Sequence, residues 1–180
     1  LTSPMLARWN LFAILAFAGG VGSSEYFALY ARGIALERSG QFDRADADFQ
    51  AALKLQPEQA PILNYLGYSW VDLNVRLDEG LDLIKKAVAL RPDDGYILDS
   101  LAWAYYRLGR YQDAVEPMEK AVSAMSDDSL VNDHMGDIYW MVGRKREAEI
   151  QWHRALSLEP ETEAEAHRIR AKLDRGLDAV

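Results

Sequence analysis

The sequence predicts an all-α fold, a right-handed superhelical solenoid of four antiparallel helix hairpins followed by a C-terminal capping helix. Small residues and helix-ending residues recur along the chain at intervals of 34 or 35 residues. The three series are Ala45, Gly80, Ala114 and Ala148; Ala52, Ala87, Ala121 and Ala155; and Pro57, Pro92, Ser126 and Pro160. A fixed period near 34 residues is typical of stacked helical hairpins, whose function normally resides in a surface and not in a catalytic pocket.

The composition agrees with one folded repeat array. The chain has 180 residues, of which 49% are hydrophobic, enough to build a continuous core. Its net charge of -8 would repel a nucleic-acid backbone, so no nucleic-acid partner is expected. The absence of cysteine excludes disulfides, thiolate metal sites and a cysteine nucleophile. No strand and no glycine-rich phosphate loop is evident, and we predict neither a cofactor nor a metal.

Each hairpin is predicted from an apolar stripe, a turn and a second stripe. In the clearest unit, Leu98, Leu101, Ala102 and Tyr105 fall at i, i+3, i+4 and i+7, the spacing of one helix face. Gly109 then ends this first helix, because glycine accepts the left-handed backbone of a C-terminal cap. The same order predicts four units, at about 26–59, 60–94, 95–128 and 129–160.

The second unit carries one extra residue. The small residues of the first helices, Gly33, Gly67, Ala102 and Gly136, are spaced by 34, 35 and 34 residues. Comparison with the series that begins at Ala45 places the extra residue in the inter-helix turn of the second unit, which contains no glycine.

With several spaced positions matched in each unit, the chain resembles the tetratricopeptide repeat family over about residues 26–160. More narrowly, three segments resemble the C-terminal repeat region of long proteobacterial members. They are NYLGYSWVD (64–72), DDGYILDSLAWAYYRLGRY (93–111) and VNDHMGDIYWMVGRKREAEIQWHRAL (131–156). The resemblance implies a scaffold that binds other proteins along a concave groove lined by the first helices.

The two ends differ from the repeats. Residues 161–180 are predicted to cap the array, with a helix from Glu161 to Leu177 whose acidic start and basic end complement the helix dipole. Residues 1–25 lie outside the repeat register, and the apolar stretch 9–22 is shorter than the roughly 20 residues that span a bilayer. Three explanations stay open for this segment: a helix packed on the first repeat, a short anchor or partner-binding helix, or the remnant of an export signal.

The free face of the first helices is the predicted partner-binding groove. Its candidate residues are Tyr30, Asn64, Tyr68, Tyr96, Asp99, Trp103, Tyr106, Asp133, Asp137 and Trp140. Aromatic side chains offer a large contact area at low entropic cost, and the aspartates would favour a basic or amide-rich segment. The alternative is that Trp103 and Trp140 pack between neighbouring first helices.

The main functional prediction is a non-enzymatic adaptor that binds an extended or helical segment of another protein. Some tetratricopeptide domains bind a terminal carboxylate through lysine, arginine and asparagine, but among the groove positions compared in the first three units only Asn64 fits that chemistry. The alternative is a structural subunit of a membrane-associated assembly held by residues 9–22. A periplasmic or membrane-associated location in a bacterium is therefore predicted, with the cytoplasm as the other possibility.

Catalysis is the least supported function. Asp99, Asp133 and Asp137 resemble the paired carboxylates of a hydrolase, but an open groove offers little desolvation to separate their pKa values. His134 with Asp137 would make a metal site of too few ligands. We therefore predict that the chain is not an enzyme.

Overall fold

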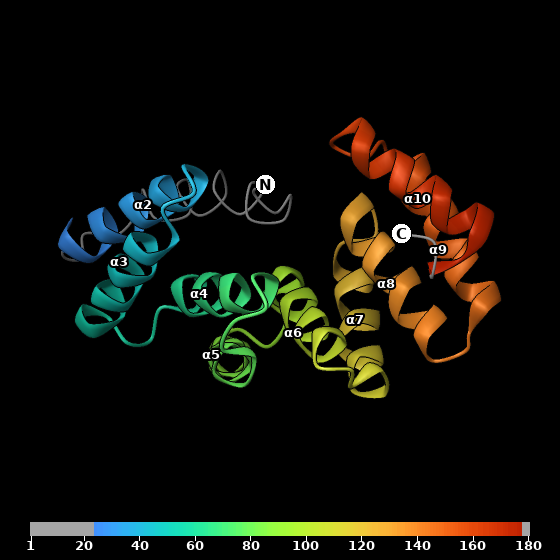
Figure 1. Cartoon of the computed structure of the whole chain (residues 1–180). Coiled ribbons are helices and arrows are strands. Elements are labelled where there is room, and N and C mark those ends of the chain that lie inside the picture. The colour runs from blue at the N-terminus through green and yellow to red at the C-terminus, as the bar shows by residue number, and fades with distance from the viewer. Residues whose placement is uncertain (1–23, 178–180) are drawn as a thin grey trace. The chain divides into compact units, whose positions relative to one another are not determined.

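The computed structural model describes residues 24–177, and over this range the chain forms nine α-helices and no strand (Figure 1). The helices are α2 (Ser24–Arg38), α3 (Phe42–Leu55), α4 (Ala60–Asp72), α5 (Leu77–Leu90), α6 (Gly95–Arg107), α7 (Tyr111–Ala124), α8 (Ser129–Met141), α9 (Lys145–Ser157) and α10 (Glu163–Arg175). The predicted all-α class is confirmed. The three explanations for the N-terminal segment fall on residues outside the described range.

The described helices form two compact units, one that ends at Leu90 and one that begins at Arg91. Unit 1 holds the hairpins α2–α3 and α4–α5, and unit 2 holds α6–α7 and α8–α9 followed by α10. Within each unit the two helices of a hairpin are joined by a turn of three or four residues, so they run antiparallel and pack side by side.

One inter-helix turn differs from the other three. Three turns have three residues and contain Gly40, Gly109 or Gly143, each with a φ between 71° and 84°. The turn between α4 and α5 has four residues and no glycine, and Asn74 and Arg76 adopt φ values of 57° and 47° there. The extra residue that the repeat spacing predicts in this turn is confirmed.

Small residues allow the two helices of a hairpin to approach closely. A β-carbon on Gly67 of α4 would lie 2.7 Å from the carbonyl oxygen of Gly80 on α5. A β-carbon on Gly136 of α8 would overlap the indole ring of Trp152 on α9. The alanines that recur along the second helices, such as Ala52, are buried. Small residues therefore recur once per repeat because each hairpin contains such a close contact between its two helices.

The C-terminal helix α10 begins two residues later than predicted. Thr162 is its N-cap and forms a capping box with Glu165, which satisfies backbone donors at the first turn. Ile169 and Lys172 are the α10 side chains that are buried most completely. No helix within residues 24–177 combines the length and apolar character needed to cross a membrane.

Candidate partner-binding site

Four of the predicted groove residues lie along one face of α6. Asp94 caps this helix, and its carboxylate accepts hydrogen bonds from the backbone N–H groups of the second and third helical residues at 3.1 and 3.3 Å. The cap sets where the helix begins. Tyr96, Asp99, Trp103 and Tyr106 then follow at spacings of three, four and three residues, which places them on a common face.

Three of these side chains form a surface that we call the α6 aromatic face, made of Tyr96, Trp103 and Tyr106. All three are half-buried. The rings of Trp103 and Tyr106 stack with centroids 4.8 Å apart and planes 10° apart. Tyr111 of α7 meets Tyr106 edge-on at 5.4 Å, and His134 of α8 stacks on Trp103 at 4.2 Å. These contacts restrain the rings of Trp103 and Tyr106, and part of each ring stays exposed.

Beneath this face, Asp99 and His134 form a buried pair. Asp99 is fully buried, and Nδ1 of His134 lies 2.9 Å from its Oδ1. Because an ionised carboxylate only accepts, the ring nitrogen donates. Burial by itself lowers the pKa of His134, but the carboxylates of Asp99, Asp133 and Asp137 together outweigh it and raise that pKa above its usual value.

The raised pKa of His134 predicts a pH-dependent contribution to stability. This contribution is fully present below the unfolded-state pKa of about 6.5 and is lost as the pH rises through the higher folded-state pKa. The stability difference between the natural chain and His134→Gln should therefore shrink from pH 6 to pH 9, as measured by urea unfolding across that range. His153→Gln, which removes an exposed imidazole from α9, is the control. A constant difference for His134→Gln would contradict the prediction.

The carboxylates of Asp133 and Asp137 both form ion pairs with a lysine of the same chain. Nζ of Lys172 on α10 lies 2.8 and 3.0 Å from the carboxylate oxygens of Asp133 and 2.8 Å from Oδ2 of Asp137. Asp137 also accepts the indole N–H of Trp152 at 2.9 Å. Burial raises the pKa of Asp137, and although Lys172 lowers it, burial with the nearby Asp133 prevails. None of the three charged residues is more than 5% exposed.

The ten predicted groove residues separate by exposure. Tyr96, Trp103, Tyr106 and Trp140 are half-buried. The other six are buried, namely Tyr30, Asn64, Tyr68, Asp99, Asp133 and Asp137. Unit 2 brings together the seven residues from Tyr96 onward, whereas the first three belong to unit 1. Their role in partner binding stays a prediction.

Lys172 is the residue that sequence reasoning missed, because it was grouped with the basic end of the C-terminal helix. The spacing of residues along the chain does contain a signal for this contact. Asp99 and His134 are 35 residues apart, and so are Asp137 and Lys172. Oppositely charged or hydrogen-bonding groups about one repeat apart on successive first helices can therefore pair. Trp140 is also tied to this end, since Gly176 packs on its ring and Trp152 lies 5.4 Å away.

Metal binding finds no support in the described part of the chain. Within residues 24–177, no three histidine, aspartate or glutamate side chains are arranged to hold a metal ion. The carboxylates of Asp133 and Asp137, which lie close together, share the ammonium group of Lys172.

Buried small residues, paired helices and a partly exposed aromatic face together define a helical-repeat binding scaffold. Models of the tetratricopeptide repeat match residues 30–95 and 96–124, which is more than half of the chain. The chain belongs to the tetratricopeptide repeat family.

The comparisons also identify individual similar proteins. The TPR repeat-containing protein PA4667 of Pseudomonas aeruginosa is 38% identical over 86 residues, which is 48% of this chain but only 15% of that protein. Among solved structures, TTC0263, a thermophilic TPR protein of Thermus thermophilus, matches with a TM-score of 0.73 and 24% identity, over 86% of this chain and 85% of its own. MamA AMB-1 matches with a TM-score of 0.65 and 21% identity, over 85% and 90%. These structures share the fold.

Proposed function

We propose that the chain is a non-enzymatic adaptor that holds an extended or helical segment of another protein against the α6 aromatic face. The observation that carries the proposal is the stacked, half-exposed pair Trp103 and Tyr106. Membership of a family of repeat scaffolds supports a binding role in general. Tyrosine and tryptophan are enriched among residues that dominate protein interfaces, because they combine large area with few rotatable bonds.

Preorganisation supports the same site. Trp103 is held between contacts from α6 and α8, so little side-chain entropy remains to be lost when a partner binds. Its indole Nε1 is shielded from solvent and has no hydrogen-bond acceptor among the described residues. A buried donor without an acceptor is costly, and a backbone carbonyl of a bound segment is a group that could satisfy it.

The charges favour an apolar partner segment over a strongly basic one. Lys172 pairs with Asp133 and Asp137, and His134 pairs with Asp99. These internal partners leave less carboxylate charge to attract a cation than the sequence suggests. We therefore assign recognition to aromatic contact and expect large apolar side chains in the partner segment. A periplasmic or membrane-associated location, which depends on residues 9–22, stays a prediction.

Replacing both Trp103 and Tyr106 with alanine should weaken partner binding by about thirtyfold or more, since the loss of even one interface hot spot costs about 2 kcal/mol. Proteins that co-purify with the natural chain would first be identified, and the affinity of each purified candidate would then be measured by calorimetry. Circular dichroism would check that the variant keeps its helical content.

Ile150→Ala provides the matched control, because Ile150 is a large apolar residue of the same unit that is 62% exposed on α9. This variant should bind the partner as the natural chain does. Equal affinities for the natural chain and the double variant would refute the groove proposal, and so would an equal loss in the double variant and in Ile150→Ala.

A further inference from the structure

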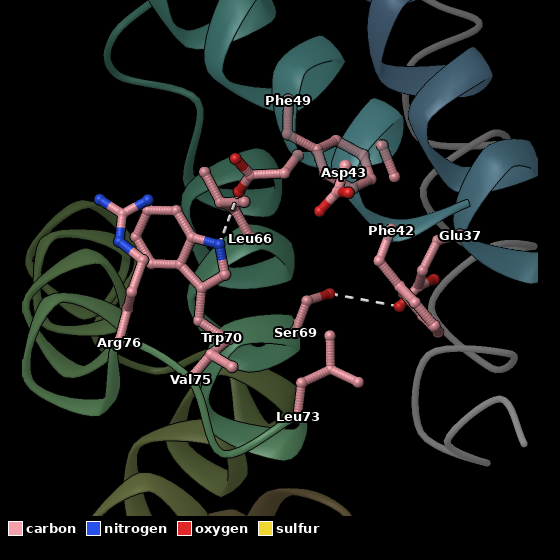
Figure 2. Close-up of a pocket in the computed structure, with 12 residues that line it drawn as sticks. Glu37, Phe42, Asp43, Phe49, Leu66, Ser69, Trp70, Leu73, Val75 and Arg76 are labelled. Carbon is pink, nitrogen blue, oxygen red and sulfur yellow. Dashed lines mark hydrogen bonds between the residues drawn. The ribbon is translucent and has the colours of Figure 1, made fainter. Parts of the chain in front are cut away.

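A cavity of about 450 Å³ lies in unit 1, and all of its lining residues belong to that unit. It forms where the ends of α2 and α4 meet the start of α3 and the turn between α4 and α5 (Figure 2). Figure 2 shows Trp70 and Arg76 on one side and Glu37 and Phe42 on the other. Its volume lies within the roughly 300–1,000 Å³ of known ligand sites.

The walls of the cavity include apolar side chains that water reaches. Phe42, Leu73 and Val75 line it and are 37%, 43% and 45% exposed. Phe49 and Leu66 form its buried apolar floor. Exposed apolar residues that gather around one concavity, unlike those scattered singly, are typical of a binding surface.

Three carboxylates share this cavity with the apolar walls. Glu37 is buried and accepts hydrogen bonds from the hydroxyls of Tyr65 and Ser69, and burial raises its pKa. Asp46 accepts the indole N–H of Trp70 at 2.6 Å. Gln50 also donates to Asp46, and the Arg76 guanidinium interacts with Asp46 electrostatically without forming a close ion pair. The exposed Asp43 forms no ion pair with any residue of the described range, so the lining carries carboxylate charge that is only partly balanced within residues 24–177.

The one basic side chain in the lining, Arg76, forms its close ion pair with a residue outside the cavity. The Arg76 guanidinium lies 3.7 Å from the centre of the Trp70 ring and forms an ion pair with Glu79. The guanidinium thus lies over the Trp70 ring and forms its close ion pair with the exposed Glu79 of α5, while it balances the charge of Asp46 only in part.

The unusual turn builds part of this cavity. Val75 and Arg76 of this turn line the cavity, and Asn74 and Arg76 both have positive φ without being glycine. Such a conformation costs free energy and persists where surrounding structure imposes it, often at functional sites. The three glycine-containing turns of the other hairpins are one residue shorter.

We propose that this cavity binds a lysine or arginine side chain of a partner protein. The aliphatic stem would pack against Phe42 and Leu73, and the cationic head would reach Asp43 and Asp46. A long basic side chain is the group that combines an apolar stem with a charged end. An anionic side chain would be repelled by the carboxylates, and a purely apolar one would bring no counter-charge to them.

The test uses the whole chain and three small probes, N-acetyl methylamides of arginine, leucine and glutamate. Trp70 is one of five tryptophans, so its indole N–H resonance in a nitrogen-15 correlation spectrum reports on this cavity once a Trp70→Phe variant has assigned it. The arginine probe should shift this resonance saturably, with a dissociation constant in the millimolar range. The glutamate probe should leave it unchanged, and the leucine probe should bind at least several-fold more weakly than arginine.

Charge-matched variants then locate the interaction. Asp43→Asn should weaken binding of the arginine probe by about three- to fivefold, the upper part of the range expected for one exposed ion pair. Asp82→Asn changes an exposed aspartate of α5 outside the cavity and should leave the affinity unchanged. Equal affinity for the leucine and arginine probes, no saturable shift of Trp70, or an unchanged affinity in Asp43→Asn would overturn the proposal.

The proposal does not depend on the α6 aromatic face. A chain that carries Trp103→Ala should keep its affinity for the arginine probe, because Trp103 belongs to unit 2 and the cavity lies wholly within unit 1. Loss of probe binding in that variant would mean that the Trp70 resonance reports a general change of the fold, and the site would be rejected.

Discussion

Replacement of Lys172 by methionine is expected to lower the free energy of unfolding of unit 2 by about 3 to 5 kcal/mol at pH 7, the cost typical of breaking a buried ion pair. Methionine keeps the length of the side chain but removes the ammonium group. The variant therefore leaves Asp133 and Asp137 buried, close together and without their cation. Urea unfolding followed by circular dichroism measures the loss.

The loss of stability in Lys172→Met should increase with pH. The pKa of Asp137 is already raised by burial, and removal of Lys172, which lowers it, would raise it further. A carboxyl group with a raised folded-state pKa favours the folded state below its unfolded pKa of about 3.9, and this advantage is lost as the pH rises through the folded value. Lys172→Met should therefore cost more at pH 7 than at pH 5.

Arg170→Met is the matched control on the same helix, because Arg170 pairs with Glu163 where both side chains are exposed. An exposed pair contributes at most about 1 kcal/mol. Adding Asp133→Asn and Asp137→Asn to Lys172→Met should restore part of the lost stability, since it removes the uncompensated charges. Similar small losses for Lys172→Met and Arg170→Met would show that the buried cluster does not stabilise the fold.

Gly67→Ala is expected to lower the stability of unit 1 by about 1 to 3 kcal/mol, as overpacking in a closely packed core does. The new β-carbon would lie 2.7 Å from the carbonyl oxygen of Gly80 and 2.9 Å from the side chain of Ile84. Because a helix backbone cannot yield locally, α4 and α5 would have to separate. This cost opposes the gain of about 1 kcal/mol that alanine brings to a helix interior.

The measurement is thermal and urea unfolding of the full chain, with Gly33→Ala for comparison. At Gly33 the obstacle to a β-carbon is the Phe49 ring, a side chain that can shift, so the loss should be smaller. A Gly67→Ala chain as stable as the natural one would show that the two helices separate at little cost.

The hairpins were predictable because local rules govern them. Apolar residues at helical spacing, such as Leu98 and Ala102, determine which side of a helix is buried. Glycines such as Gly109 allow the left-handed residue at the end of the first helix, and the period of small residues reveals the close helix contacts. Even the extra residue of the α4–α5 turn could be located, since it shifts one spacing from 34 to 35.

The burial of the aspartates was not predictable from the same rules. The four-residue spacing of Asp133 and Asp137 places them on one helix face, which a single helix would expose. Lys172 reaches both from α10, and this contact depends on how α8 and α10 are rotated and offset along their axes. Those variables are set by packing between segments that lie 35 or more residues apart.

The cavity of unit 1 was likewise predictable only in part. The spacing of repeats marked the unusual turn, but the space beside it is bounded by side chains from α2, α3, α4 and the turn itself. Its shape depends on all of their rotamers at once, and no single stretch of the chain encodes that.

Residue order along the chain thus specified the repeat length, the four hairpins, the irregular turn and the aromatic residues of α6, because each follows from short-range backbone geometry and hydrophobic periodicity. Folding in three dimensions settled which of those polar and aromatic side chains stay accessible. In the folded chain, Lys172 forms ion pairs with Asp133 and Asp137 of α8, whereas Trp103 and Tyr106 stay half-exposed. Exposure results from contacts between helices and not from the spacing of residues within one helix.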